Sequence, residues 1–142
     1  MASHSGLALF CESAREEVEG TISLIGIIPD NVNVPAFPGT FARLVVYVRL
    51  NFSVDYKLSA PVSVTIEAPH GDTISQSMVP ADLFSRARDE AIDRGSPIIG
   101  IILTFRMDNV PIRSPGLLIA RATFGDESII CGALAIKGVP ST

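Results

Sequence analysis

The feature that most constrains this chain is a strict alternation of side chains over residues 43–52. Apolar residues occupy every second position, namely Leu44, Val46, Val48, Leu50 and Phe52. The intervening positions are polar or aromatic, and Val45 is the one aliphatic residue among them. Because a β-strand directs successive side chains to opposite faces, this spacing predicts a strand with one core face and one largely solvated face.

Comparable short segments recur along the chain and are separated by turn residues. The expected strands are residues 7–11, 20–28, 43–52, 62–67, 74–79, 97–107, 116–124 and 128–137, with the charged residues 12–19 as a connection between the first two. We predict a mainly β fold of seven or eight strands, arranged as a two-sheet antiparallel β-sandwich with Ig-like or Greek-key connections. A single sheet closed on itself is the alternative.

Residues 82–94 interrupt this pattern and predict one inserted α-helix. Charges of alternating sign stand four residues apart at Asp82, Arg86, Glu90 and Arg94. The apolar residues between them share one face of a helix and can dock on a sheet. Asp82 is the expected N-cap, and Gly95 marks the end. Residues 97–107 are apolar on both faces, which predicts a central strand covered by the other sheet and by this helix.

Size and composition limit the class of protein. The 142 residues suit a single domain, residues 1–142, and 47% apolar content excludes a disordered chain. A net charge of −4 disfavours nucleic-acid binding. The apolar runs 98–105 and 6–11 are too short for a membrane span or a secretion signal, so we expect a cytoplasmic protein outside the membrane. Its mean hydropathy of +0.39 is high for such a protein.

No motif for a cofactor is present. The chain contains no phosphate loop, zinc spacing or dinucleotide fingerprint, so we predict no cofactor and no metal. Cys11 and Cys131 stand in apolar runs, which favours two reduced, buried thiols.

One candidate site is the turn at residues 69–72, where His70 stands close to Asp72. A carboxylate there can orient the imidazole as a base, although the sequence contains no nucleophile elbow to accompany it. The favoured interpretation is an exposed turn. Acidic residues in predicted loops raise the separate hypothesis of a calcium site: Asp30, Asp55, Asp72, Asp108 and Asp126.

The other candidate site is the proline-rich segment PDNVNVPAFPG at residues 29–39. Rigid loops at the end of a sandwich often bind ligands or partners. The candidate binding residues are Asp30, Asn31, Asn33 and Phe37. The alternative is a crossover between the sheets with Phe37 in the core, and the bond from Phe37 to Pro38 is a candidate for either isomer.

Three motifs in the first third of the chain carry a resemblance. They are Cys11-Glu12, the run GTISLIGI at residues 20–27, and VPAFP at residues 34–38 leading into the strand at Leu44. This pattern resembles a family of small bacterial proteins known only as a domain of unknown function. The resemblance implies a bacterial origin and a shared fold, and it assigns no site.

These observations favour a non-catalytic binding or assembly module that self-associates through an apolar sheet face. We therefore expect a homo-oligomer, or a module for another protein partner, and no enzyme. The first alternative is a small-molecule-binding protein or enzyme with a loop-end site near His70 and Asp72. The second alternative is a calcium-binding sandwich.

Overall fold

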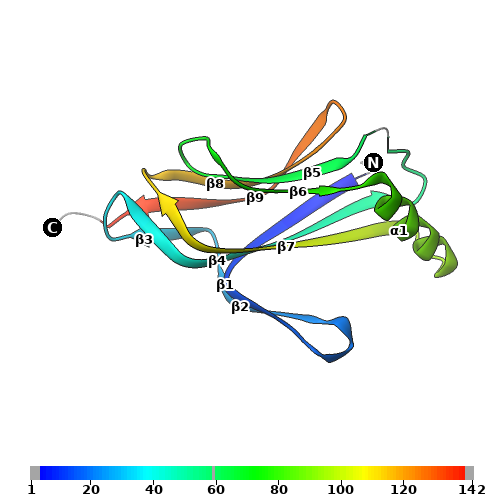
Figure 1. Cartoon of the computed structure of the whole chain (residues 1–142), viewed down its shortest axis with the longest axis horizontal. Coiled ribbons are helices and arrows are strands. Elements are labelled where there is room, and N and C mark those ends of the chain that lie inside the picture. The colour runs from blue at the N-terminus through cyan, green and yellow to red at the C-terminus, as the bar shows by residue number, and fades with distance from the viewer. Residues whose placement is uncertain (1–3, 59, 140–142) are drawn as a thin grey trace.

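The computed structural model describes residues 4–58 and 60–139, which form two stacked β-sheets and one helix (Figure 1). The four-stranded sheet has the order β2-β1-β4-β7 and the five-stranded sheet the order β3-β9-β8-β5-β6. The first consists of β1 (His4–Glu16), β2 (Ile22–Ile28), β4 (Gly39–Ser53) and β7 (Ile98–Ile112). The second consists of β3 (Asn31–Val34), β5 (Val62–Glu67), β6 (Thr73–Val79), β8 (Gly116–Phe124) and β9 (Glu127–Gly138). The predicted β-sandwich is confirmed.

The described residues contain nine strands where the sequence predicts seven or eight. The additional strand is β3, which lies inside the proline-rich segment that was expected to be a loop. It pairs with β9 in parallel, whereas all other neighbouring strands are antiparallel. The four residues of β3 are too few to show an alternation that sequence patterns can detect.

The core lies between the inner faces of the two sheets. Along β4, Val46, Val48 and Leu50 are completely buried, and each is one of the alternating residues that the sequence assigns to the core. The opposite layer contributes β8, where Leu118, Ala120 and Ala122 alternate in the same way. Two half-apolar sheets therefore bury one face each, which is the physical basis of the sandwich.

The single helix, α1 (Ala81–Asp93), confirms the helix predicted at residues 82–94. It connects β6 of one sheet to β7 of the other and lies at one end of the sandwich (Figure 1). Its Phe84 is 2% exposed and meets the ring of Phe52 edge to face, with ring centroids 5.1 Å apart. The N-cap is Pro80, so the expectation for Asp82 is wrong, and Asp82 lies in the first turn, where a carboxylate favours the helix dipole.

The prediction for residues 97–107 is also wrong in part. These residues form β7, which is an edge strand of the four-stranded sheet. Its outward side chains Ile98 and Ile102 are 48% and 44% exposed, so α1 does not cover them. The outer face of this strand therefore leaves two isoleucines partly exposed to solvent, on the same strand as the exposed charges of Arg106 and Asp108.

Two further observations complete the fold. Cys11 and Cys131 are both buried and both free. In the described part of the chain, no helix combines the length and the apolar character needed to cross a membrane.

We predict that Phe52→Ala lowers the free energy of unfolding by about 3–5 kcal/mol, because it empties a fully packed aromatic site. Urea denaturation followed by circular dichroism measures this loss. Ile130→Ala is the control, since Ile130 is 56% exposed and its truncation should change stability by less than about 0.5 kcal/mol. Equal losses in the two variants would contradict the assigned core.

Candidate functional site

The candidate residues of the proline-rich segment do not converge on one site. Asp30, Asn31 and Asn33 are exposed at or beside β3, and the carbonyl of Asp30 accepts a hydrogen bond from the Ala135 amide at 3.0 Å. Phe37 is half-buried and packs against the core, and its bond to Pro38 is cis. Phe37 therefore packs against the core, as the alternative interpretation expected. The three polar residues lie along a sheet edge.

His70 and Asp72 do lie together, in the turn between β5 and β6. The His70 Nε2 atom is 3.1 Å from Asp72 Oδ2, and an Arg113 nitrogen is 3.9 Å from the same oxygen. His70 Nδ1 is buried and has no hydrogen-bond partner among the described residues. Two strands, β9 and β8, separate this turn from β3 in the sheet, a distance of roughly 15 Å at the usual strand spacing. The two candidate groups thus occupy the same sheet without forming one site.

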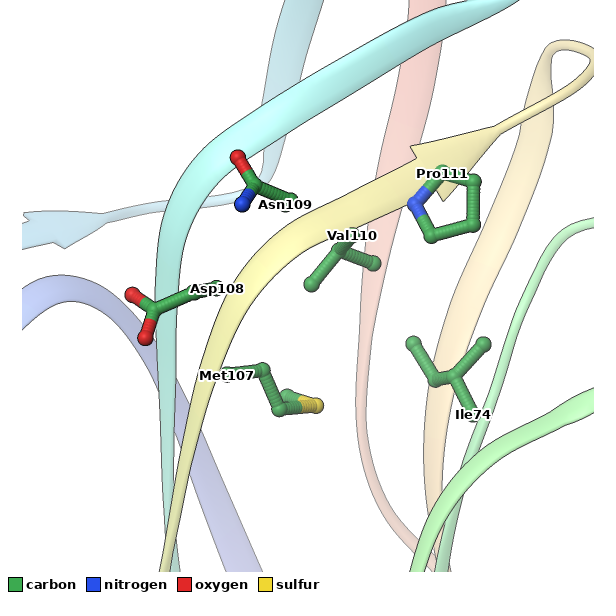
Figure 2. A pocket seen from close by; sticks show the side chains of 6 residues that line it. All are labelled: Ile74, Met107, Asp108, Asn109, Val110 and Pro111. Atoms are coloured by element: carbon green, nitrogen blue, oxygen red, sulfur yellow. The ribbon is translucent and has the colours of Figure 1, made fainter.

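A cavity of about 400 Å³ lies where β6 and β7 face each other at the open side of the sandwich. Figure 2 shows the side chains that line it: Ile74, Met107, Asp108, Asn109, Val110 and Pro111. The polar ends of Asp108 and Asn109 lie on the other side of the β7 ribbon from Ile74 (Figure 2). The other lining side chains, Ile74, Met107, Val110 and Pro111, are apolar.

The calcium hypothesis finds no site in the described part of the chain. No three His, Cys, Asp or Glu side chains among these residues gather closely enough to hold a metal ion. Asp108, which was expected in a loop, is an exposed residue within β7.

The most unusual feature of the molecule is a hairpin arm formed by β1 and β2. β1 pairs with β4 only as far as Cys11, and beyond that point its only partner is β2. We define residues 12–26 as the arm. The charged residues 12–19 were expected to form a connection, whereas β1 continues as a strand to Glu16. Figure 1 shows the arm as the blue hairpin that leaves the four-stranded sheet on the side turned away from the other sheet.

The arm begins at a bend that requires glycine. Gly26 has a φ of +69°, a conformation that other residues rarely adopt. A Cβ atom at this position would also lie 2.7 Å from a carboxylate oxygen of Glu12 on the neighbouring strand. The positive φ is the constraint that favours glycine here, because the Glu12 carboxylate is the far end of a flexible side chain and can move aside.

The bend explains why Val45 interrupts the alternation of residues 43–52. Val45 points to the outer face of β4, yet it is only 2% exposed, and its neighbour Cys11 on β1 is 0% exposed. Neither belongs to the core cluster between the sheets. Both lie in the angle between arm and sheet, where Ser13 and Ala14 of the arm line a cavity with Val45. The lone apolar residue on a polar face was thus the sequence signal for the arm.

Further along, arm and sheet form the two walls of a groove, which we call the arm groove. It has a volume of about 360 Å³ and is lined by Gly20, Thr21, Ile22 and Leu24 of the arm and by Tyr47 and Ile102 of the sheet. Aliphatic and aromatic side chains make up most of these walls. Sequence reasoning missed the groove, because the position of the arm over the sheet depends on the bend at Gly26.

Apolar side chains are concentrated on the arm and on the sheet face beside it. Ile25 and Ile27 are 47% and 51% exposed, and Val18 at the tip is 87% exposed. On the sheet, Leu7 and Ile102 are 49% and 44% exposed. We call this surface, from the arm to the outer face of β4 and β7, the arm face. Several exposed apolar side chains thus lie on this one face, with Arg49 standing between Leu7 and Ile102.

The charges of the arm face are distributed unevenly, although Asp108 stands among the arginines of the sheet. Between residues 12 and 19 the arm carries four glutamates and one arginine. The outer face of the sheet carries Arg43, Arg49 and Arg106, and none of the three forms an ion pair with another described residue. One end of the arm face is therefore acidic, and the sheet beside its base is rich in arginine.

Comparison with known proteins adds one finding. A family of unknown function (DUF6941) matches residues 6–134, a stretch that includes the arm, α1, all of β2 to β8 and parts of β1 and β9. This confirms the resemblance to a domain of unknown function that the sequence motifs carry. No curated protein and no solved structure matches the chain.

We predict that Cys11 reacts slowly with iodoacetamide, because burial raises the pKa of its thiol and the arm blocks access. Leu24→Asp removes an apolar contact of the arm groove and should speed alkylation of Cys11 by about tenfold or more. Leu117→Asp, on an exposed site of β8, is the matched control and should leave the rate unchanged. Peptide mass spectrometry measures both. If Cys11 reacts as fast in the native protein as in urea, the arm does not block access to its thiol.

Proposed function

This chain belongs to the DUF6941 family, whose function is unknown, and we propose that it is a non-catalytic module that self-associates through the arm face. The proposal rests on the arm, because its two strands pair only with each other beyond Cys11.

The observation that carries the proposal is the apolar composition of β2. Five of its seven residues are Ile or Leu, and none of the seven is buried. A two-stranded hairpin is only marginally stable in water unless another surface covers it. Full burial of an aliphatic side chain contributes about 1.5–3 kcal/mol, so covering several half-exposed ones supplies substantial binding energy. A second surface over the arm would thus stabilise it and the complex together.

The charge pattern supports a second copy of this chain as that surface. The acidic arm tip and the arginine-bearing sheet are complementary to each other, and both belong to the same molecule. Two copies related by a twofold axis bring each acidic tip toward the other copy's arginines, since such an interface repeats every contact twice. Charge complementarity of this kind favours correct pairing and speeds association.

We predict that the protein has a mass above that of the 15.1 kDa monomer in size-exclusion chromatography with light scattering. Ile102→Glu and Ile25→Glu should each shift it to the monomer, because each places an unpaired charge in the interface. Ile130→Glu is the matched control, since it makes the same change at an exposed position of β9. A monomeric wild-type protein at high concentration, or equal dissociation by the control, would overturn the proposal.

We also predict that the association weakens as ionic strength rises from about 0.05 M to about 0.5 M, because salt screens the pairing of glutamate and arginine. Arg106→Glu should raise the dissociation constant at low salt and flatten the salt dependence. Arg86→Glu, at an exposed position on α1, should do neither. Analytical ultracentrifugation gives the dissociation constants. A salt dependence that Arg106→Glu leaves unchanged would exclude this residue from the interface.

A further inference from the structure

The two sheets end in four edge strands, and three of these carry features that obstruct pairing with another chain. β7 contains Pro111, which lacks an N–H, together with the charged residues Arg106 and Asp108, and α1 packs against it. β3 has only four residues and stands between Pro29 and Pro35.

The third obstructed edge is β6. Polar side chains dominate its centre at Ser75, Gln76 and Ser77, and Pro80 and α1 follow it directly. Short, polar or proline-flanked edges of this kind are the usual protection of natural sheets against edge-to-edge pairing.

The fourth edge, β2, is the least protected inside the strand itself, although Pro29 follows it directly and Gly26 within it has a φ of +69°. Its seven residues, Ile22–Ile28, include no charged residue and no proline. Its described sheet partner is β1, so the backbone groups on its other side have no strand beside them. β-branched residues supply four of the seven positions, which favours the extended conformation that a pairing strand needs.

We infer that β2 pairs edge to edge with β2 of a second copy, in antiparallel orientation about a twofold axis. This inference rests on the proposed self-association and gives its geometry. The two four-stranded sheets then form one continuous sheet of eight strands. A twofold axis permits only antiparallel pairing of identical strands, and a register that uses the whole strand places the axis at Ile25.

The charges of the arm face agree with this arrangement. Antiparallel pairing carries the acidic tip of each arm past the base of the other arm. At that base, Ile27, Cys11, Val45 and Arg106 stand side by side across four neighbouring strands. The tip glutamates of one copy thus approach Arg106 and Arg43 of the other. A parallel arrangement would place the two acidic tips together.

Hydrogen exchange with mass spectrometry tests the pairing on the wild-type protein. Amides of residues 22–28 should exchange about tenfold or more slowly at concentrations where the protein is associated than where it is dissociated. Amides of β6, an edge strand outside the proposed contact, should exchange at the same rate in both conditions. Equal exchange of residues 22–28 in an associated protein would overturn the edge pairing and leave the proposed self-association standing.

Cysteine cross-linking tests the register. Ile25→Cys places two thiols across the axis, at the separation of a directly opposed pair, and mild oxidation should give a covalent dimer in high yield. Ile28→Cys and the wild-type protein, whose own cysteines are buried, are the controls and should stay uncross-linked. If Ile28→Cys cross-links as well as Ile25→Cys, the stated register is wrong. A wild-type protein that is monomeric at all concentrations would overturn both this inference and the proposed function.

Discussion

The register of β4 is the constraint on which the rest of the structure depends. This strand pairs with β1 on one side and β7 on the other, and its inner residues Val46, Val48 and Leu50 are completely buried. A shift of one residue would turn every one of them to solvent, so the hydrophobic core holds the strand in a single register. The same register fixes what the outer face carries. Because the inner residues are held in the core, Tyr47, Arg43 and Arg49 must lie on the outer face. Val45 lies on the same face and contacts the arm.

Much of the fold could be predicted from the sequence, because alternation reports burial on one face. The sandwich and the hairpin of β8 and β9 follow from that signal. The helix follows instead from the four-residue spacing of its charges, and it is displaced by a single residue at each end. The errors arise where burial does not control the pattern. Residues 12–16 form a strand with little buried surface, so their charges resemble those of a loop. The isoleucines of β7 suggested a covered strand, whereas one chain alone leaves Ile98 and Ile102 exposed.

The candidate site was less predictable than the fold. Sequence reasoning identified residues by chemical type in turns, and His70 and Asp72 indeed lie in contact. The arm face depends instead on the direction in which the hairpin of β1 and β2 leaves the sheet. That direction changes at Gly26, which has a left-handed conformation. Periodicity contains no information about such a bend. Only the misplaced aliphatic side chain of Val45 indicated that something covers the outer face, and it did not reveal what.

Pro111 on β7 has a consequence for the size of any assembly. A sheet with two unprotected edges can add copies without limit and grow into a fibre, as cross-β polymers do. In this chain the edge opposite β2 is obstructed by Pro111, which has no N–H to donate, and by α1, which packs against part of the strand. If β2 pairs as we infer, edge-to-edge growth terminates after one addition. A strand sequence that would be an aggregation hazard in isolation becomes compatible with a finite, closed particle, because the hazard exists on one side only.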